Sequence, residues 1–233
     1  MLELDNVSTG YDDVQVLWDV SLRVEVGELV SLLGNNGAGK TTTLGAIMGI
    51  LPLFGGDVRF RGESITEVSV QDRSGLGLTI APEDDAVFPD MTVKGNLRVS
   101  AYGVDKEERR RRLERVYDLF PRLQERTGQY ADTLSGGERQ MLNIGSALMR
   151  DPDMLLIDEP SLGLAPMLAD DILSEIENIS NQGMTVLLVE QNVNKALSIS
   201  DRAYVMEKGQ IRLEGRAKDL MNDEKVRESY LGI

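Results

Sequence analysis

The chain has 233 residues, of which 41% are hydrophobic and 27% charged, a composition typical of a globular protein with room for a substantial core. Its net charge of −14 argues against a general nucleic-acid binder and against direct adhesion to anionic lipid. Because it contains no cysteine and no histidine, disulfides, thiolate metal sites and imidazole chemistry are excluded. An acid, base or metal ligand must therefore be a carboxylate, hydroxyl, amide or lysine.

The start of the chain is predicted to form antiparallel strands. Residues 2–8 and 14–24 alternate apolar and polar side chains, as half-solvated strands do. Tyr11 lies in the expected turn between them, where its ring either stacks on an adenine or covers a strand end. The first residues lack the pattern of a signal peptide, and no apolar run is long enough to span a bilayer. We therefore expect a cytoplasmic protein that serves a membrane only through a partner.

A phosphate-binding loop follows. Gly34 to Thr41 (GNNGAGKT) match the pattern G-x-x-x-x-G-K-[ST] at every specified position. The apolar run 28–33 and the helical spacing of 42–50 predict the strand and helix that flank such a loop. Glycines let backbone N–H groups surround an anion, and the helix start adds unpaired donors. Lys40 is placed to reach the β- and γ-phosphates, and the Thr41 hydroxyl to bind Mg²⁺. A glycine-rich turn that binds nothing is the alternative, which the flanking elements disfavour.

The rest of the chain predicts strands alternating with helices, and hence a mainly parallel sheet. The expected strands are 57–61, 76–81, 153–158 and 184–190, with a hairpin of 202–207 and 210–214; the expected helices are 66–72, 166–180, 192–199 and 217–230.

Between about 84 and 150, apolar residues recur at three- and four-residue steps, which indicates an inserted helical segment. The arginines at 109–112 have acids at helical spacing, so we interpret them as a solvated helix face rather than a basic patch. The fold class is then α/β: a phosphate-loop (RecA-like), mainly parallel sheet core with an N-terminal antiparallel β layer and an inserted helical subdomain. We expect a single domain over 1–233, with the core at about 1–83 and 151–233 and the helical subdomain at about 84–150.

Two acids end the expected buried strand 153–158. Ligands of open α/β sheets sit at the carboxyl ends of the strands, where Asp158 suits a magnesium site and Glu159 could polarise an attacking water as general base. A loop start or helix cap would be the alternative for these acids alone. The phosphate loop upstream favours catalysis.

A second anion-binding helix start is predicted at Leu134 to Gln140 (LSGGERQ), where a serine and two glycines open a helix expected at about 138–149. One compact site cannot easily use two such helix starts to bind the same triphosphate. The second is better explained as a contribution to the nucleotide of a partner subunit.

With these motifs in this order, the chain resembles the ATP-binding subunit of ABC transporters along nearly its whole length, and LSGGERQ is similar to that family's signature motif. The resemblance implies ATP and Mg²⁺ as cofactors, Tyr11 as the adenine-stacking ring, and Asp158 and Glu159 in the magnesium and water-activating roles. Two ATP molecules would be sandwiched in a head-to-tail dimer. The residues implied to bind each nucleotide are Gly34, Asn35, Asn36, Gly37, Ala38, Gly39, Lys40, Thr41 and Thr42 of one chain, and Ser135, Gly136 and Gly137 of the opposing one.

Three departures from the commonest family pattern narrow the resemblance. Pro82-Glu83 stands where Pro-Gln is usual, SLGLAP follows Glu159-Pro160, and Gln191 replaces the family's histidine. The segments APE…VFPDMTV, DEPSLGLAP and LLVEQN are similar to one of the two ATPase subunits of branched-chain amino acid importers. Urea and short-chain amide importers look closely related.

These substitutions complete the expected site. Glu83 can still reach a magnesium-bound water, and Gln191 can donate to the γ-phosphate but cannot titrate. The catalytic set is thus Glu159, Lys40 and Gln191, and the metal set Thr41, Asp158 and Glu83.

The function implied by the resemblance is an ATPase subunit that powers an importer from the cytoplasmic face of the membrane. Its expected partners are permease subunits, a second ATPase subunit that is identical or different, and indirectly a solute-binding protein, with no nucleic acid. A soluble ABC-type ATPase acting on DNA or ribosomes is the second reading, but the sequence has none of the coiled coils, tandem cassettes or basic arms of that class. A small-molecule kinase is the third, in which LSGGERQ would have no purpose.

Overall fold

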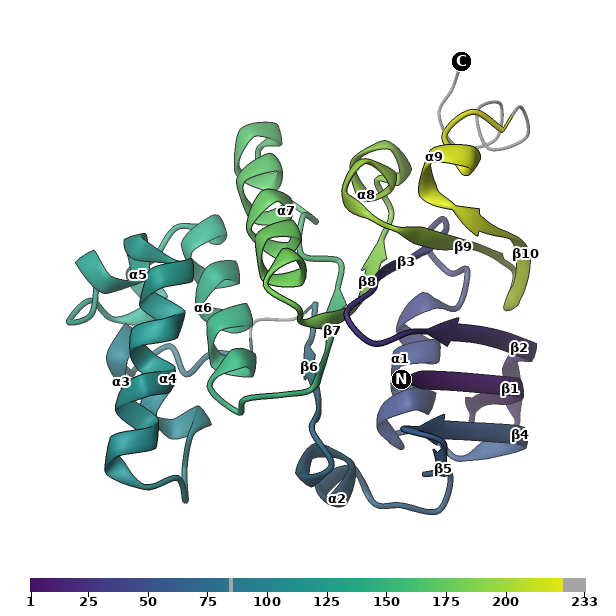
Figure 1. Ribbon diagram of the computed structural model, residues 1–233, viewed down its shortest axis with the longest axis horizontal. Coiled ribbons are helices and arrows are strands. Elements are labelled where there is room, and N and C mark those ends of the chain that lie inside the picture. Colours follow the sequence, from purple (N-terminus) through teal and green to yellow (C-terminus); the bar gives the residue numbers. More distant parts are fainter. Residues whose placement is uncertain (84–85, 224–233) are drawn as a thin grey trace.

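A computed structural model describes residues 1–83 and 86–223 (Figure 1). Its centre is a six-stranded sheet in the order β10-β9-β3-β8-β7-β6. The five strands from β9 to β6 run parallel, and only β10 pairs antiparallel with its neighbour β9. The expectation of a mainly parallel core is therefore confirmed. The strands are β3 (Leu29–Leu33), β6 (Leu78–Ala81), β7 (Met154–Asp158), β8 (Thr185–Glu190), β9 (Arg202–Glu207) and β10 (Gln210–Arg216).

A second, antiparallel sheet carries the start of the chain, which confirms the N-terminal β layer. Its order is β2-β1-β4-β5, and it consists of β1 (Leu2–Tyr11), β2 (Val14–Val24), β4 (Leu53–Phe60) and β5 (Glu63–Ser64). The placing of Tyr11 in the turn was wrong. Tyr11 is the last residue of β1 and pairs with Val14, so that only residues 12 and 13 form the turn.

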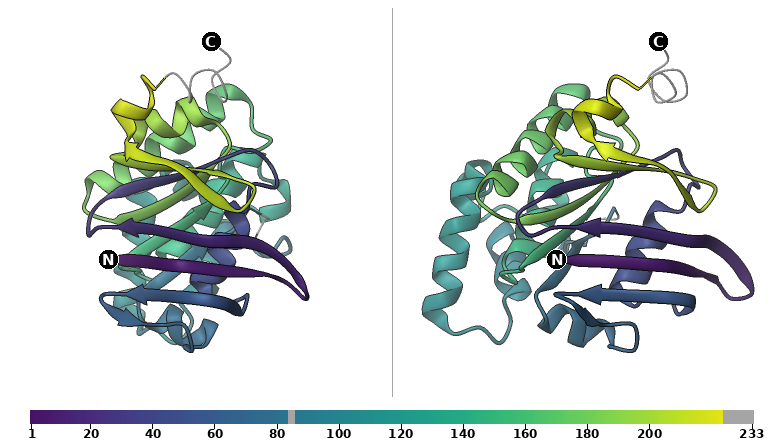
Figure 2. Two further views of the ribbon diagram at one scale, coloured as in Figure 1. Left: turned by 90° about the vertical axis from the view of Figure 1, so that its right-hand side faces the viewer. Right: turned by 45° about the vertical axis from the view of Figure 1, so that its right-hand side comes forward.

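Helix α1 (Lys40–Met48) lies between the two sheets, as the views in Figures 1 and 2 show. On the other face of the six-stranded sheet lie α7 (Pro166–Asn181) and α8 (Val193–Ile199), and beyond α7 the helical segment is visible on the left of Figure 1. That segment contains α3 (Val93–Ser100), α4 (Lys106–Leu119), α5 (Pro121–Glu125), the 3₁₀ turn Ala131–Thr133 and α6 (Gly136–Leu148).

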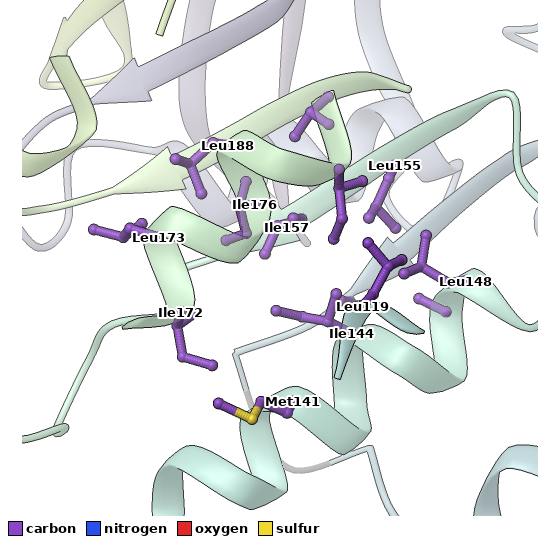
Figure 3. Packing of buried hydrophobic residues seen from close by; sticks show 14 of the residues in the cluster. Leu119, Met141, Ile144, Leu148, Leu155, Ile157, Ile172, Leu173, Ile176 and Leu188 are labelled. Carbon is purple, nitrogen blue, oxygen red and sulfur yellow. The ribbon is translucent and has the colours of Figure 1, made fainter. Parts of the chain in front are cut away.

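The mainly apolar strands at the centre of the six-stranded sheet pack on both faces. Along β3, Leu29 and Leu33 join the core under the helices, whereas Val30 and Leu32 join the core around α1 and the antiparallel sheet. This period-two division is what buried parallel strands require. The helical side of the core is shown in Figure 3, where residues of α6 and α7 meet those of β7 and β8.

A side-chain cap explains where helix α2 begins. Ser69 caps α2 (Val70–Gly75), which starts later than the expected 66–72 because the Thr66 hydroxyl donates to Asp57 and accepts from Val58 N.

In α4, Arg110 and Arg111 are exposed, as a solvated helix face requires, but Arg109 and Arg112 are half-buried. Arg112 pairs with Glu108 and also donates to Met149 O.

The end of the chain is described only in part. Helix α9 covers Ala217–Leu220, and residues 224–230 of the helix expected there lie outside the described residues. None of the helices within 1–83 and 86–223 combines the length and apolarity needed to cross a membrane.

Candidate nucleotide-hydrolysis site

The phosphate loop connects the end of β3 to the start of α1, as the motif requires. Gly39 caps the helix with φ 109°, a conformation that residues with a Cβ avoid. A Cβ on Gly34 would lie 2.5 Å from the carbonyl oxygen of Met206. The Thr43 hydroxyl donates to the Gly39 carbonyl at 2.9 Å and holds the loop against the first turn of the helix. The sequence pattern does not specify Thr43, so its contribution was not predicted.

Lys40 and Glu159, both expected to be catalytic, form a buried ion pair. Lys40 Nζ lies 2.9 Å from Glu159 Oε1, and their side chains are only 3% and 6% exposed. Lys40 Nζ also donates to the carbonyls of Gly34 at 2.8 Å and Asn35 at 3.2 Å. All three ammonium protons thus have acceptors. Glu159 itself has φ 43°, and its N–H donates to Val189 O, which fixes the chain where it leaves β7.

Asp158 has the properties of a cation-binding carboxylate. It is 2% exposed, and its Oδ1 has no hydrogen-bond partner within residues 1–83 and 86–223. Burial raises the pKa of Asp158 to about 6, and the charges of Glu159 and Glu83 add to the rise, whereas a hydrogen bond with Thr41 and the charge of Lys40 oppose it.

Magnesium fits this arrangement of donors. Hydroxyl and carboxylate oxygens suit Mg²⁺, which is usually held by one or two protein groups together with substrate phosphates. Among the described residues no cluster of three acids could hold a metal by itself. Thr41 and Asp158 would therefore hold Mg²⁺ together with oxygens of a nucleotide.

Four of the six catalytic and metal residues expected from the sequence, Lys40, Glu159, Thr41 and Glu83, line one cavity of about 270 Å³, whereas Asp158 and Gln191 are not part of its lining. Glu83 reaches it from the end of β6, where the Asn143 side-chain amide donates to Pro82 O at 2.8 Å. Leu162, which was not predicted, covers another side. The lining is Asn36, Gly37, Gly39, Lys40, Thr41, Thr42, Glu83, Glu159 and Leu162.

Tyr11 lies at the edge of this site. Its hydroxyl is 3.4 Å from Thr42 Oγ1, and the residue is 49% exposed. The ring is therefore available to a base bound beside the phosphate loop, and adenine stacking stays a prediction.

Gln191 is not in the same cavity. It lines an adjoining one of about 390 Å³, which shares Glu159 and Leu162 with the first. Glu190, the residue before it, also lines this second cavity and is 2% exposed. The sequence places an acid at the end of a buried strand here, as it does at Asp158, but the prediction assigned a role to Gln191 alone.

The serine and glycines of LSGGERQ lie apart from both cavities. Ser135 caps α6 and forms a capping box with Glu138, so the helix starts at Gly136 rather than at about 138. Gly136 and Gly137 face Leu164 and Leu168 of the same chain, with 3.2 Å and 3.5 Å between an added Cβ and those side chains. Neither cavity includes residues 135–137 in its lining. The helix start at Ser135 is thus separate from the chain's own phosphate loop, as a role toward another subunit would require.

A parallel sheet with a phosphate loop, a lysine and two acids at one edge defines a phosphate-loop nucleoside triphosphatase. Residues 17–162 match the family model described as "ABC transporter". The chain belongs to this family as an ABC transporter ATPase, in which ATP binding and hydrolysis are coupled to transport.

Relatives of similar length cover the whole chain. It is 45% identical to the high-affinity branched-chain amino acid transport ATP-binding protein BraG of Pseudomonas aeruginosa, with 100% of both chains covered. It is 38% identical to the probable branched-chain amino acid transport ATP-binding protein LivF of Archaeoglobus fulgidus, covering 100% of this chain and 99% of the relative. It is also 34% identical to the lipopolysaccharide export system ATP-binding protein LptB of Haemophilus influenzae, with 100% and 97% covered.

A solved structure of the ADP conformation of an ABC transporter's ATP-binding cassette superposes with a TM-score of 0.89 at 29% identity, covering 100% of this chain and 99% of the other. The expected fold class and family are confirmed by these matches.

Proposed function

We propose that this ATPase powers the import of branched-chain, hydrophobic amino acids. The observation that carries the proposal is the 45% identity over the full length of a relative named for that transport. The likeness to LptB at 34% is lower and provides the alternative of an exporter subunit, and urea or amide import stays a further alternative.

The residues of the site would have different roles in ATP binding and hydrolysis. The phosphate loop would hold the β- and γ-phosphates, Tyr11 the adenine, and Glu159 would accept a proton from the attacking water. Magnesium, when bound, would neutralise phosphate charge, and Thr41, Asp158 and, through water, Glu83 would hold it.

The Lys40–Glu159 ion pair supports an order in which nucleotide binding precedes the action of Glu159 as base. Because Lys40 uses all three protons on Glu159 and two carbonyls, phosphates must attract Lys40 away from these acceptors. Glu159 is then released as the base only when nucleotide is in place.

The working assembly has permease subunits and a second ATPase subunit, identical or different, on the cytoplasmic face of a membrane. In that assembly Ser135, Gly136 and Gly137 would contact the γ-phosphate held by the opposing subunit. Their separation from the chain's own cavity supports this part of the proposal.

The test measures uptake of labelled leucine and of labelled urea in cells that carry either the native chain or Glu159→Gln in place of it. Leucine uptake that depends on Glu159, with urea uptake unchanged, is the expected result. Glu159-dependent urea uptake would reassign the substrate, and uptake of neither solute would contradict an importer of these compounds. Membrane proteins co-purifying with the chain identify the permease in each case.

A further inference from the structure

Glu190 is a buried carboxylate that has no role among those proposed above. It ends β8, is 2% exposed and has no ion-pair partner among the residues the structure describes. Instead it accepts three main-chain N–H groups. Oε1 accepts from Ser161 N at 3.1 Å, and Oε2 accepts from Gln191 N at 3.1 Å and Asn192 N at 3.3 Å.

The two oxygens hold two different loops. Ser161 lies two residues after Glu159 in the loop that follows β7, and Gln191 begins the loop that follows β8. Both loops line the 390 Å³ cavity, which shares Glu159 with the phosphate cavity. The Glu159 N–H itself donates to Val189 O at 2.9 Å, so this loop is held at Glu159 by Val189 and at Ser161 by Glu190.

A carboxylate is the side chain that suits three converging donors, because it only accepts hydrogen bonds. A glutamine of the same shape would turn an NH₂ group toward at least one of the backbone N–H groups. Burial raises the pKa of Glu190, opposed by its hydrogen bonds with Ser161 and Asn192, and the charge of Glu159 adds to the rise. A buried acid without a cation is costly, which argues that it is retained for what it holds in place.

We propose that Glu190 is a positioning residue for ATP hydrolysis: its carboxylate holds the loop that carries Glu159 in fixed relation to the loop that carries Gln191. The water-activating base and the proposed γ-phosphate contact would then move as one unit. The inference rests on the roles proposed for Glu159 and Gln191. Glu190 acts through these residues and does not touch the nucleotide.

The test compares Glu190→Gln with the native chain in the complete transporter complex, measuring kcat and KM for ATP. We expect kcat to fall between ten- and a hundredfold, because small displacements of reacting groups have effects of that size. The KM for ATP and the rise in Tm on adding MgATP should stay within twofold, because Glu190 does not touch the phosphate loop. Glu190→Asp keeps the charge and both acceptor oxygens, and should recover part of the lost kcat.

A double-mutant cycle separates positioning from general stability. Because Glu190 is proposed to act partly through Gln191, the kcat loss of Glu190→Gln with Gln191→Ala should be smaller than the product of the two single losses. Glu28→Gln is the matched control. Glu28 also accepts a main-chain N–H, from Glu25 at 3.0 Å, but unlike Glu190 it pairs with Arg202, and it precedes β3 at the opposite edge of the sheet. The kcat of this variant should be unchanged.

The inference is overturned if folded Glu190→Gln has a native kcat, if kcat and ATP binding are lost together, or if the double variant shows the full product of losses. If Glu190→Gln does not fold, Glu190→Asp decides, and a native kcat in that variant contradicts the proposal. Failure of the proposed function differs from all of these: leucine uptake would not depend on Glu159, or Glu159→Gln would hydrolyse ATP at the native rate, whatever the kcat of Glu190→Gln.

Discussion

At the residue scale, we propose that the Lys40–Glu159 ion pair links nucleotide binding to activation of the base. Two oppositely charged side chains at 2.9 Å, both almost fully buried, stabilise each other only while both are present. A triphosphate offers Lys40 a stronger partner and leaves Glu159 free for water.

We predict that Glu159→Gln binds ATP and does not turn it over. Glutamine keeps the size of the side chain, so the cavity keeps its shape, but an amide cannot accept a proton from water. Nucleotide binding is measured by the rise in Tm on adding MgATP, and turnover by phosphate release. Glu207→Gln, at an exposed ion pair with Lys208, is the control and should hydrolyse normally. Native turnover in Glu159→Gln would remove this residue as the base.

Asp158 gives a prediction about pH. Its pKa of about 6 in the folded chain lies above the ordinary 3.8, so the folded state holds the proton more tightly than the unfolded state. The stabilisation is complete below pH 3.8 and is lost as the pH rises through 6. Two pKa units correspond to about 3 kcal/mol.

Asp158→Asn removes this dependence, because asparagine is neutral at every pH. Without nucleotide or magnesium, the variant should exceed the native chain in free energy of unfolding by on the order of 3 kcal/mol at pH 8, and by little at pH 4. Urea titrations in EDTA across this range measure the difference. Equal stabilities at pH 8 would contradict the raised pKa of the buried Asp158.

The site was predictable from the sequence where a pattern fixes spacing. Lys40, Thr41, Asp158 and Glu159 share an edge of the sheet because two strands that run parallel end there. The Lys40–Glu159 contact and the bridging role of Glu190 were not predictable. They depend on side-chain directions and on backbone N–H groups, which residue types do not reveal.

At the scale of elements, Arg73 holds the end of the phosphate-loop helix. It is 2% exposed, and its guanidinium donates to Ala46 O and Ile47 O in the last turn of α1. It also donates to Thr66 O and Val68 O, and thereby joins α2 to the same point. A cation at a helix C-terminus satisfies carbonyls that the helix leaves without donors.

We predict that Arg73→Met destabilises the chain by about 3 kcal/mol or more, because it leaves several buried carbonyls without donors. The free energy of unfolding from urea titration measures this loss. Arg110→Met, which removes a largely exposed ion pair with Glu114, should cost about 1 kcal/mol or less. Similar losses in the two variants would contradict the account of Arg73.

The sequence predicted the types of the helices and strands more accurately than it predicted their boundaries. Alternation and apolar runs predicted the strands because burial of one or both faces depends on residue order alone. Helix α2 starts after Ser69 and helix α6 after Ser135, because the side chains of these serines cap the two helices. Strand β5 has only two residues, which is too short to give a pattern. Arg73 reads as a surface residue in the sequence, and only packing shows it buried.

At the scale of the whole molecule, the two helix starts that we propose to bind anions do not meet. One is the phosphate loop at α1, and the other is Ser135 at α6, which lines neither of the two cavities that share Glu159. A single copy therefore lacks half of the proposed nucleotide sandwich. The sequence predicted this separation from the two motifs, but the division of the chain at about 84 and 150 stays a prediction.

The most direct test of this account is the mass, by light scattering, of Glu159→Gln saturated with MgATP in the presence of its cognate ATPase partner. The account predicts a stable pair that returns to single chains when ATP is removed. Ser135→Arg in the same background should bind ATP in its own cavity and pair poorly. Single chains that stay unpaired although both partners are saturated with MgATP would contradict the central claim that two subunits share each nucleotide.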